Sequence, residues 1–325
     1  MAPQKPLVSI IITTKNEEKN IGNCLKSIVN SNIALEQYRY IDKKKKESIR
    51  LKSYKAKSLS KPLSYEIIVV DNNSTDRTKE IARKYVGTVY NFPNPNEIKG
   101  IKNFRGAQLN FGVRKSEGEI IFFPDADMTF EKGLIKEAAA LIEKQNFDAL
   151  YIPEAVMGKG ILGKIRNFER SFYNTTCIDA IRVIKKDLFI KAGGFDEKNI
   201  AFGPDDWDFT KTVKKNTDKI SITKSKIYHH EEEMTIRKYL SKKNKYSQTF
   251  DDYIKKWGKD DPDIKKQFGL WYRYFGVFLE NGKWKKLLRY PLLASGMFAL
   301  RFLVGFSFLR AKLLTKRRKS LNKLN

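Results

Sequence analysis

The segment EGEIIFFPDADM, residues 117–128, decides the fold class of this 325-residue chain. Within it, Glu119–Phe123 has the apolar run and the length expected of a strand that is covered on both faces of a parallel sheet. Two similar runs occur earlier, at Val8–Ile12 and Glu66–Val70, and polar residues follow each of them directly. These patterns predict three buried strands, each ending in a polar turn.

Segments with helical periodicity alternate with the predicted strands. They are Asn16–Val29, Asp76–Tyr85 and Glu131–Lys144. A further strand is predicted at Ile220–Ile227, ending at two histidines. Because strands and helices that alternate along a chain are typical of a sheet with parallel strands, we expect an α/β fold.

The composition excludes several kinds of protein. His229 and His230 are the only two histidines, which excludes a zinc enzyme with several histidine ligands. The two cysteines, Cys24 and Cys177, cannot form a disulfide framework, and no CxxC pair is present for zinc. The apolar run Leu7–Ile12 is too short for a signal peptide, so we expect the protein to be made and to act in the cytoplasm.

The net charge of +27 is concentrated in two regions. From Arg237 to the end there are 23 Lys and Arg against 6 Asp and Glu, a net charge of +17, and Arg39–Lys61 holds 10 Lys and Arg against 2 acids. Such charge favours contact with nucleic acid or with an anionic membrane surface, although it is also compatible with a solvated surface. The apolar residues among the C-terminal charges favour the membrane, and no nucleic-acid partner is expected.

The apolar stretch Leu292–Leu309 supports that interpretation. It is 18 residues long, near the lower limit for a membrane span, but Arg301 lies at its centre and basic residues flank it. A helix lying in the membrane interface fits this pattern better than a span, and a buried helix of a soluble domain is the alternative. We therefore predict a catalytic domain at 1–235, with a basic insertion at 31–64, and a basic, aromatic, helical membrane-associating region at 236–325.

Acidic and hydroxyl side chains follow each of the three buried strands, in Thr13–Glu17, Asp71–Thr75 and Asp125–Asp127. Open α/β sheets bind ligands beyond the carboxyl ends of their strands, so these segments are expected to form one site. Asp125 and Asp127 are suited to Mg²⁺ or Mn²⁺, which bind hard oxygen ligands and keep positions for phosphate oxygens. Asp71 could accept a hydrogen bond from a nucleoside, or could belong to a cap of the following helix.

Three other groups are candidates for the same site. Paired carboxylates such as Asp205 and Asp206 repel each other, so one of them can act as an acid or base, although they could also simply begin a helix. Trp207 beside them could form the floor of a sugar pocket or belong to the core. The pair His229 and His230 could supply a neutral imidazole to a metal ion. Arg105 could neutralise a diphosphate with its guanidinium group.

Taken in order, five motifs resemble those of family 2 glycosyltransferases with the GT-A fold. The motifs are VSIIITTKNEEKNIGNCLKSI (8–28), YEIIVVDNNSTDRT (65–78), EGEIIFFPDADM (117–128), GGFDEKNIAFGPDDWDF (193–209) and IYHHEEEMTIRKYLSKKNKYSQ (227–248). The resemblance covers about Leu7–Phe250, and the ordered set is much more specific than any one motif. It implies a Rossmann-like mixed sheet with helices on both faces.

The resemblance also implies roles for individual residues. It places the nucleotide-sugar donor against five residues, namely Thr13, Glu17, Asp71, Arg105 and Asp125. It implies that Asp127 and His229 hold Mn²⁺ or Mg²⁺, with His230 as a substitute ligand. Asp206 corresponds to the general base with Asp205 as its neighbour, and Trp207 lies on the acceptor side.

The sequence departs from the family pattern at several positions. The usual Pro and Tyr of the first loop are Thr13 and Lys15, and Asn72-Asn73 stands where Asp-Gly is commoner. Leu109-Asn110 replaces the expected Arg-Asn, which moves the diphosphate role towards Arg105. The insertion Asn32–Ser64 is longer than usual.

The expected function is metal-assisted, inverting transfer of a sugar from a nucleotide donor to a hydroxyl of a saccharide or lipid-linked acceptor at the cytoplasmic face of a membrane. The resemblance favours a UDP-sugar as the donor. A polyprenyl-phosphate sugar synthase ranks second, because MTFEKGL, residues 128–134, lacks the His-Pro-Pro sequence associated with that branch. A nonenzymatic basic protein that binds membranes or nucleic acid is the third alternative, supported by the charge alone.

Overall fold

The computed structural model describes residues 5–41, 63–94 and 98–321, with the backbone alone for 32–41 and 311–321. Its centre is a seven-stranded mixed sheet in the order β3-β2-β1-β4-β8-β6-β9. The strands are β1 (Val8–Thr14), β2 (Tyr65–Asp71), β3 (Val89–Asn91), β4 (Ile120–Phe122), β6 (Ala149–Tyr151), β8 (Ile181–Lys185) and β9 (Ile220–Ile222). Only β8 runs antiparallel to its neighbours β4 and β6 within this described sheet.

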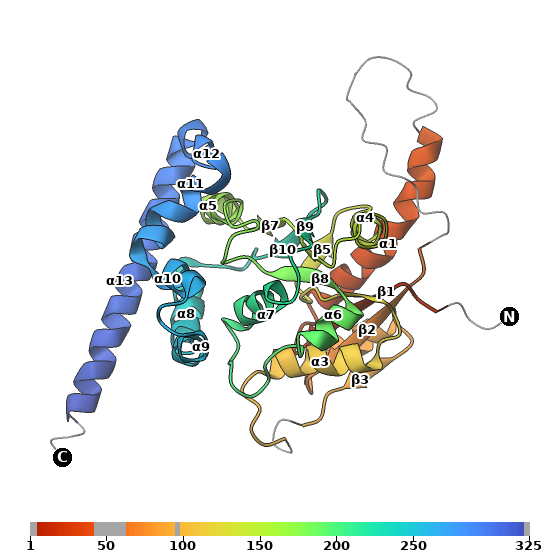
Figure 1. The fold of residues 1–325 in the computed structure, drawn as a ribbon, viewed down its shortest axis with the longest axis horizontal. Helices are drawn as coiled ribbons and strands as arrows, with labels where there is room; N and C mark the ends of the chain where they lie inside the picture. Colours follow the sequence, from red (N-terminus) through yellow and green to blue (C-terminus); the bar gives the residue numbers. More distant parts are fainter. Residues whose placement is uncertain (1–4, 42–62, 95–97, 322–325) are drawn as a thin grey trace.

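Helices cover both faces of this sheet (Figure 1). One face is covered by α1 (Ile21–Ile41), α2 (Thr78–Arg83) and α4 (Leu134–Lys144). The other is covered by α3 (Phe104–Lys115), α6 (Lys186–Lys191) and α7 (Asp205–Lys214). Strand β1 has apolar side chains on both of its faces. Ile10 and Ile12 pack in one core, and Ile11 packs in the other. The expected α/β architecture with helices on both faces is confirmed.

Helix α3 packs closely against β1, and this contact determines where the first turn of α3 lies. A Cβ at Gly112 would be 2.4 Å from Cγ2 of Ile11, so only glycine permits this contact. Asn103 begins the helix, because its side-chain oxygen accepts a hydrogen bond from the Gly106 N–H at 2.9 Å. The first turn therefore holds Arg105 at the carboxyl ends of the central strands.

A second sheet has three strands in the order β5-β10-β7, namely β5 (Met128–Phe130), β10 (Ile227–His230) and β7 (Glu154–Met157), and helix α5 (Gly160–Arg170) follows β7. The single strand predicted at Ile220–Ile227 was wrong, because β9 and β10 belong to different sheets. The chain turns between them, where the Lys224 and Ser225 N–H groups donate to the carboxylate of Glu137 on α4. This turn redirects the chain so that the two histidines lie beside β5 and β7.

The predicted strands at Val8–Ile12, Glu66–Val70 and Glu119–Phe123 correspond to β1, β2 and β4 to within two residues at each end. The helix predicted at Asn16–Val29 begins later, at Ile21, and continues to Ile41. Most of the basic run at 39–61 and of the insertion at 31–64 lies outside the described residues.

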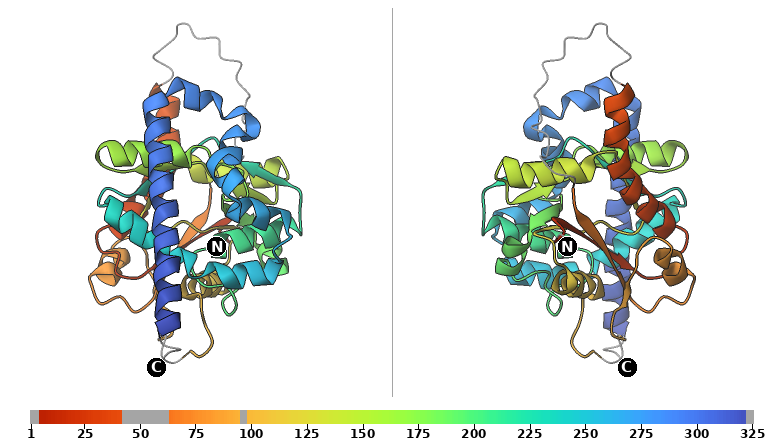
Figure 2. Two further views of the ribbon diagram at one scale, coloured as in Figure 1. Left: turned by 90° about the vertical axis from the view of Figure 1, so that its left-hand side faces the viewer. Right: turned by 90° about the vertical axis from the view of Figure 1, so that its right-hand side faces the viewer.

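The C-terminal region is helical. Its elements are α8 (Ile236–Ser247), α9 (Phe250–Trp257), α10 (Pro262–Phe268), a π-helical turn (Tyr272–Gly276), α11 (Val277–Leu279), a 3₁₀ turn (Glu280–Gly282), α12 (Lys285–Arg289) and α13 (Pro291–Leu321). Helix α13 lies along one side of the molecule (Figure 2), where it contacts α5 and α8. The domain boundary at 235 stays a prediction.

The charge at the centre of α13 has a protein partner. Arg301 is 7% exposed, and its guanidinium forms an ion pair with Glu169 of α5, with Nε and Oε1 3.1 Å apart. Glu169 also pairs with Arg166, which in turn pairs with Glu231 after β10. One face of α13 is therefore attached to the catalytic unit by a buried network of charges, and Arg301 does not face a lipid phase.

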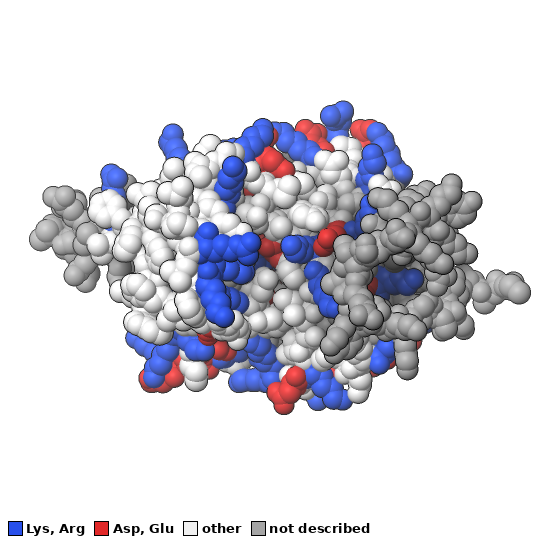
Figure 3. Space-filling model, turned by 90° about the horizontal axis from the view of Figure 1, so that it is seen from above, with Lys and Arg blue, Asp and Glu red and all other residues white. Residues whose placement is uncertain are grey.

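The opposite face of α13 is apolar and exposed. Only 22% of the window Pro291–Arg310 is buried, its mean hydropathy is 1.8, and it is the one helix in the described chain that is long and apolar enough to cross a membrane. Exposed apolar side chains on α12 and α13 include Leu288, Leu292, Phe302, Phe306 and Leu309. In Figure 3 this end of the molecule, on the left, is mostly uncharged and is bordered by Lys and Arg side chains. A C-terminal apolar helix is thus present, and it is not the fully buried helix of the alternative interpretation.

Replacing the buried carboxylate tests this network. Burial alone would raise the pKa of Glu169, but Arg301 and Arg166 lower it to about 2. Because its ordinary value is 4.5, the ionised side chain stabilises the fold above about pH 4.5, and this contribution is lost as the pH falls towards 2. We expect Glu169→Gln to reduce the free energy of unfolding by roughly 3 kcal/mol near pH 7 and by much less near pH 2.

Urea denaturation of both proteins over this pH range measures the difference. Glu80→Gln is the matched control, because Glu80 belongs to an exposed ion pair with Lys84 that contributes little at any pH. If the loss in free energy of unfolding for Glu169→Gln were the same at every pH, it would contradict the assignment of Glu169 as an ionised partner of Arg301 and Arg166.

Candidate active site

The carboxyl ends of β1, β2 and β4 meet at one edge of the central sheet. Strand β1 lies between the other two, and Thr13 near its end forms an isolated β-bridge with Asp125, which follows β4. Asp71 ends β2, where its carboxylate accepts a hydrogen bond from the Thr14 hydroxyl at 3.0 Å. The three polar segments that the sequence places after separate strands therefore lie side by side, as predicted.

Arg105 joins three carboxylates from distant parts of the chain. Its Nε and Nη2 lie 2.9 Å from Oδ1 of Asp125. Its Nη1 donates to Oδ2 of Asp205 at 3.1 Å and to Oδ1 of Asp206 at 3.0 Å. The Asp-x-Asp turn and the first turn of α7 are thus held together by one guanidinium group, whose side chain is 13% exposed.

A second arginine, Arg182 of β8, supports the same cluster. Its Nη1 donates to Oδ2 of Asp125 at 3.1 Å, and its Nη2 lies 3.8 Å from Oδ2 of Asp206. Sequence reasoning missed Arg182, although a charged residue inside the apolar strand IRVI was a signal that could have found it. Two arginines thus face three carboxylates. A diphosphate could replace some of these carboxylates as the partner of the guanidinium groups.

The pKa shifts follow from this arrangement. Burial alone would raise the pKa of Asp125, but Arg105 and Arg182 hold it well below its ordinary value. The pKa of Asp205 is raised, mainly by burial and by the neighbouring Asp206, despite the opposing effect of Arg105. Asp205 is enclosed, since its side chain is 3% exposed against 24% for Asp206. Of the two adjacent carboxylates, Asp206 is the one that an acceptor can reach.

Asp127 and His229 form the second half of the site. His229 Nε2 lies 3.0 Å from Oδ2 of Asp127, and its Nδ1 lies 3.0 Å from Oε1 of Glu154. Burial would lower the pKa of His229, but Asp127 and Glu154 raise it to about 10. Glu154 is held in turn by Arg170 at 3.2 Å. Glu154 was not predicted, and its position after Pro153 gave little indication of this role.

The donor atoms of Asp127 and His229 fit a divalent cation. Oδ1 of Asp127 is buried and has no hydrogen-bond partner, so one carboxylate oxygen is directed at a place where the protein supplies no donor. The described residues hold no group of three or more His, Cys, Asp or Glu side chains arranged as a metal site. Two ligands suit an ion that takes its other ligands from water and a substrate diphosphate.

His230 faces away from this pair. Adjacent residues of a strand point to opposite faces, and its Nε2 contacts the Thr129 hydroxyl at 2.8 Å while its Nδ1 contacts Glu232 at 2.7 Å. It borders a hollow of about 160 Å³ that Asp127 and Asn23 also line. The structure therefore favours His229 over His230 as the ligand that joins Asp127.

Glu17 and Asp71 are placed differently with respect to the site. Burial raises the pKa of Glu17, and the nearby Asp127 and Asp125 raise it further, although a hydrogen bond from Asn20 opposes this shift. Asp71 is fully buried, and besides Thr14 its carboxylate accepts hydrogen bonds from the Ser74 N–H and hydroxyl at 2.9 and 2.5 Å. Asp71 holds two loops together here, and its contact with a nucleoside stays a prediction.

Trp207 is half-buried and packs against aromatic residues. Its indole N–H donates to the Ile178 carbonyl at 3.2 Å, and its ring stacks on Phe250 with centroids 6.0 Å apart. Tyr253 and Phe268 complete this aromatic cluster, which attaches α7 to α9 and α10. Trp207 therefore has a packing role here, and its place on the acceptor side stays a prediction.

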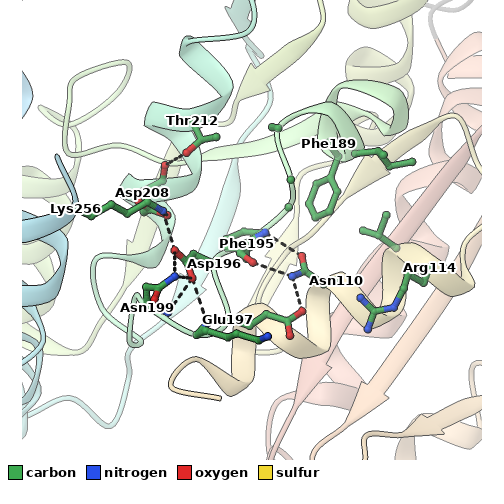
Figure 4. Close-up of a pocket in the computed structure, with 16 residues that line it drawn as sticks. Asn110, Arg114, Phe189, Phe195, Asp196, Glu197, Asn199, Asp208, Thr212 and Lys256 are labelled. Carbon is green, nitrogen blue, oxygen red and sulfur yellow. Dashed lines mark hydrogen bonds and ion pairs between the residues drawn. The ribbon is translucent and has the colours of Figure 1, made fainter. Parts of the chain in front are cut away.

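A larger hollow than the one beside His230 lies elsewhere. It measures about 600 Å³ and lies between α3, α7 and the loop after α6 (Figure 4). Asn110 crosses its base, where its amide donates to the Phe195 carbonyl and accepts from the Phe195 N–H, both at 2.9 Å. Lys256 pairs with Asp196 and Asp208 at its rim. None of the predicted site residues lines this hollow.

A mixed α/β sheet with acidic residues at the ends of its strands places the chain in the class of α/β proteins that bind ligands at that edge of the sheet. The family model described as "Glycosyl transferase family 2" matches residues 9–192, more than half of the chain. The protein belongs to this family, and it is a glycosyltransferase.

Among known proteins, poly(ribitol-phosphate) β-N-acetylglucosaminyltransferase TarS of Staphylococcus aureus is 25% identical over 230 residues, 68% of this chain and 35% of that protein. Dolichyl-phosphate β-glucosyltransferase of Mus musculus is 29% identical over 127 residues, 39% of this chain and 32% of that protein. The chain thus spans about a third of the length of these relatives. Mannosyltransferase PcManGT of Pyrobaculum calidifontis, solved with GDP-Man and Mn²⁺, has the same fold, with a TM-score of 0.55 at 18% identity over 94% of this chain and 88% of that one.

We expect Arg182→Gln to lower the free energy of unfolding by about 3 kcal/mol, because it removes a buried cation from between Asp125 and Asp206. The exposed pair Arg77–Glu18 provides the control, and Arg77→Gln should cost less than about 1 kcal/mol. Both values come from urea denaturation monitored by circular dichroism. Equal, small losses for the two variants would show that Arg182 does not support the cluster.

Proposed function

We propose that this glycosyltransferase moves a sugar from a nucleoside diphosphate donor, with UDP favoured, to a hydroxyl group of a saccharide or lipid-linked acceptor, with inversion at the anomeric carbon. The observation that carries this proposal is that Arg105 joins Asp125 to Asp206, while Asp127, two residues after Asp125, contacts His229. Arg105 and Arg182 balance the negative charge of the carboxylates and could turn to the donor diphosphate when it binds.

The residues of the cleft divide between two tasks. Mn²⁺ or Mg²⁺, held by Asp127 and His229, would stabilise the negative charge of the leaving diphosphate. Thr13 and Glu17 would lie on the donor side, and Asp125 orients Arg105 because its Oδ1 contacts both Nε and Nη2 of the guanidinium. The role of Asp71 would be to hold the loop that receives the nucleoside, with or without a direct contact.

Asp206 is the proposed general base. As the acceptor hydroxyl attacks C1 of the sugar, its proton passes to a carboxylate oxygen of Asp206 and the bond from C1 to the diphosphate breaks. A single displacement of this kind inverts the configuration without a covalent intermediate. Asp205 is enclosed by Asn103 and Arg105, so it positions the start of α7 and does not receive the proton.

The membrane surface is the proposed location of the reaction, on the cytoplasmic side. The exposed apolar face of α12 and α13 and the neighbouring Lys and Arg side chains support this. Because the opposite face of α13 is held by Arg301 and Glu169, the helix would lie in the interface and keep the catalytic unit close to the lipid.

Transfer to a polyprenyl phosphate is the second candidate, and the match to a dolichyl-phosphate β-glucosyltransferase favours it. TarS, by contrast, is named for a poly(ribitol phosphate) acceptor. The nonenzymatic alternative loses its support, because the chain belongs to a family of transferases.

A thermal-shift panel of nucleotide sugars, with and without Mn²⁺, identifies the donor. We expect one donor to raise the melting temperature only when the metal is present, because the cation joins the diphosphate to Asp127 and His229. Asp127→Asn is expected to abolish the shift. A panel in which no nucleotide sugar stabilises the protein would contradict the proposed function.

With the donor known, Asp206→Asn tests the base. We expect the rate of transfer to a hydroxyl acceptor to fall by roughly 10²–10⁴-fold, with donor binding unchanged. Asp260→Asn is the control, because Asp260 is 99% exposed and far along the chain from the site. Nearly full activity of Asp206→Asn would favour the polyprenyl phosphate acceptor, which is already a nucleophile without a base.

A further inference from the structure

One face of α8 runs from the network around Arg301 to the catalytic carboxylates. Tyr239, Lys243 and Tyr246 share this face, because residues three and four apart on a helix are neighbours. At one end the guanidinium of Arg166 lies over the Tyr239 ring, 4.5 Å from its centroid. At the other end Tyr246 contacts Phe202, which lies in the loop that leads into α7. In Figure 1, α8 accordingly lies between α13 and α7.

Tyr246 also lies beside the start of α7, since a Cβ at Gly203 would be 3.4 Å from Cδ1 of its ring, and the Gly203 N–H donates to Oδ1 of Asp205 at 3.0 Å. After burial, which is the largest cause, the negative charges of Asp205, Asp125 and Asp206 raise the pKa of its phenol. A residue one helical turn earlier on the same face is therefore within reach of a ligand whose far end lies at Asp206. Lys243 is that residue, and its ammonium lies 5.4 Å from the Tyr239 centroid and 5.9 Å from that of Tyr246.

The charges around Lys243 are out of balance. Glu169 forms ion pairs with both Arg166 and Arg301, and Glu231 forms an ion pair with Arg166. Lys243 and Arg273 of the π-helical turn are both half-buried, and neither side chain forms an ion pair with a carboxylate of the described residues. The pKa of Lys243 is lowered to about 7 by burial and by Arg166 and Arg273, with Glu169 opposing. Half-buried cations that repel one another without a counter-charge are the features of an anion-binding site.

The surroundings point to an amphiphilic anion. The residue next to Lys243, Asn244, donates to the Ser307 hydroxyl of α13 at 2.9 Å. Tyr274, which follows Arg273, lies against Phe302 of α13 with ring centroids 5.2 Å apart. Phe302 and Phe306 belong to the exposed apolar face, at 62% and 67% exposed. The unpaired cations are thus directly beside the surface along which an acyl or prenyl chain could lie.

We propose that Lys243 and Arg273 bind the phosphate of a lipid-linked acceptor, whose hydrocarbon chain lies on the exposed face of α13 and whose sugar hydroxyl extends along α8 to Asp206. This inference rests on the proposed function, and it selects the lipid-linked acceptor from the classes named there. The site is separate from the donor site, because Arg105 and Arg182 are paired with Asp125, Asp205 and Asp206.

The test uses the full chain and three probes, namely farnesyl phosphate, farnesol and inorganic phosphate, with binding measured by isothermal titration calorimetry. We expect farnesyl phosphate to bind at least tenfold more tightly than either of the other probes, because only it offers both the charge and the chain. Lys243→Gln and Arg273→Gln should each weaken its binding about tenfold, as expected for loss of one charge-assisted contact. Lys243→Arg keeps the charge and should retain binding.

Lys245→Gln is the matched control, because Lys245 is exposed on the same helix, and it should change binding by less than twofold. Nucleotide binding in the presence of Mn²⁺ should be unchanged in all these variants, which also shows that they are folded. Farnesol or inorganic phosphate binding as tightly as farnesyl phosphate would overturn the inference, as would unchanged affinity in both glutamine variants. Since binding is measured without turnover, a failure of sugar transfer would refute the proposed function and leave this result standing.

Discussion

The whole site depends on the ion pairs of Arg105. One guanidinium group contacts Asp125 after β4 and both Asp205 and Asp206 at the start of α7. Without a cation at this place, three carboxylates would lie together in a largely buried cleft, where their mutual repulsion and their loss of hydration would be costly. Arg105 can take this position because Gly112 lets α3 approach β1 closely, so the packing of the core determines the geometry of the chemistry.

Much of this could be predicted from the sequence, for a physical reason. A strand that is buried on both faces must be apolar throughout, so β1, β2 and β4 are visible as runs such as Val8–Ile12. Parallel strands that follow one another through helices end at the same edge of the sheet. The polar residues after each strand were therefore expected to lie together, and Asp125 and Thr13 do so. Local pattern and topology were sufficient for that conclusion.

The rest depends on contacts between residues that are distant in the sequence. Nothing near Glu154 in the chain indicates that it holds His229, and the charge of Arg182 within an apolar strand does not indicate that its partner is Asp125. The division of residues 220–230 between two sheets follows from a turn that is bound by α4, and Trp207 is half-buried because α9 and α10 pack against it. Arg301 was evidence against a membrane span, but the sequence does not indicate that its partner is Glu169. Each of these residues has partners on a helix or strand that is distant from it in the sequence.

The central claim is that Asp127 and His229 hold a divalent cation against the donor diphosphate. Anomalous diffraction at the manganese edge, from crystals grown with Mn²⁺ and UDP, tests it most directly. The account predicts a single strong peak within bonding distance of Oδ1 of Asp127 and Nε2 of His229, with diphosphate oxygens completing the coordination. A nucleotide bound in the cleft with no manganese peak there, or with the peak at His230 instead, would contradict it.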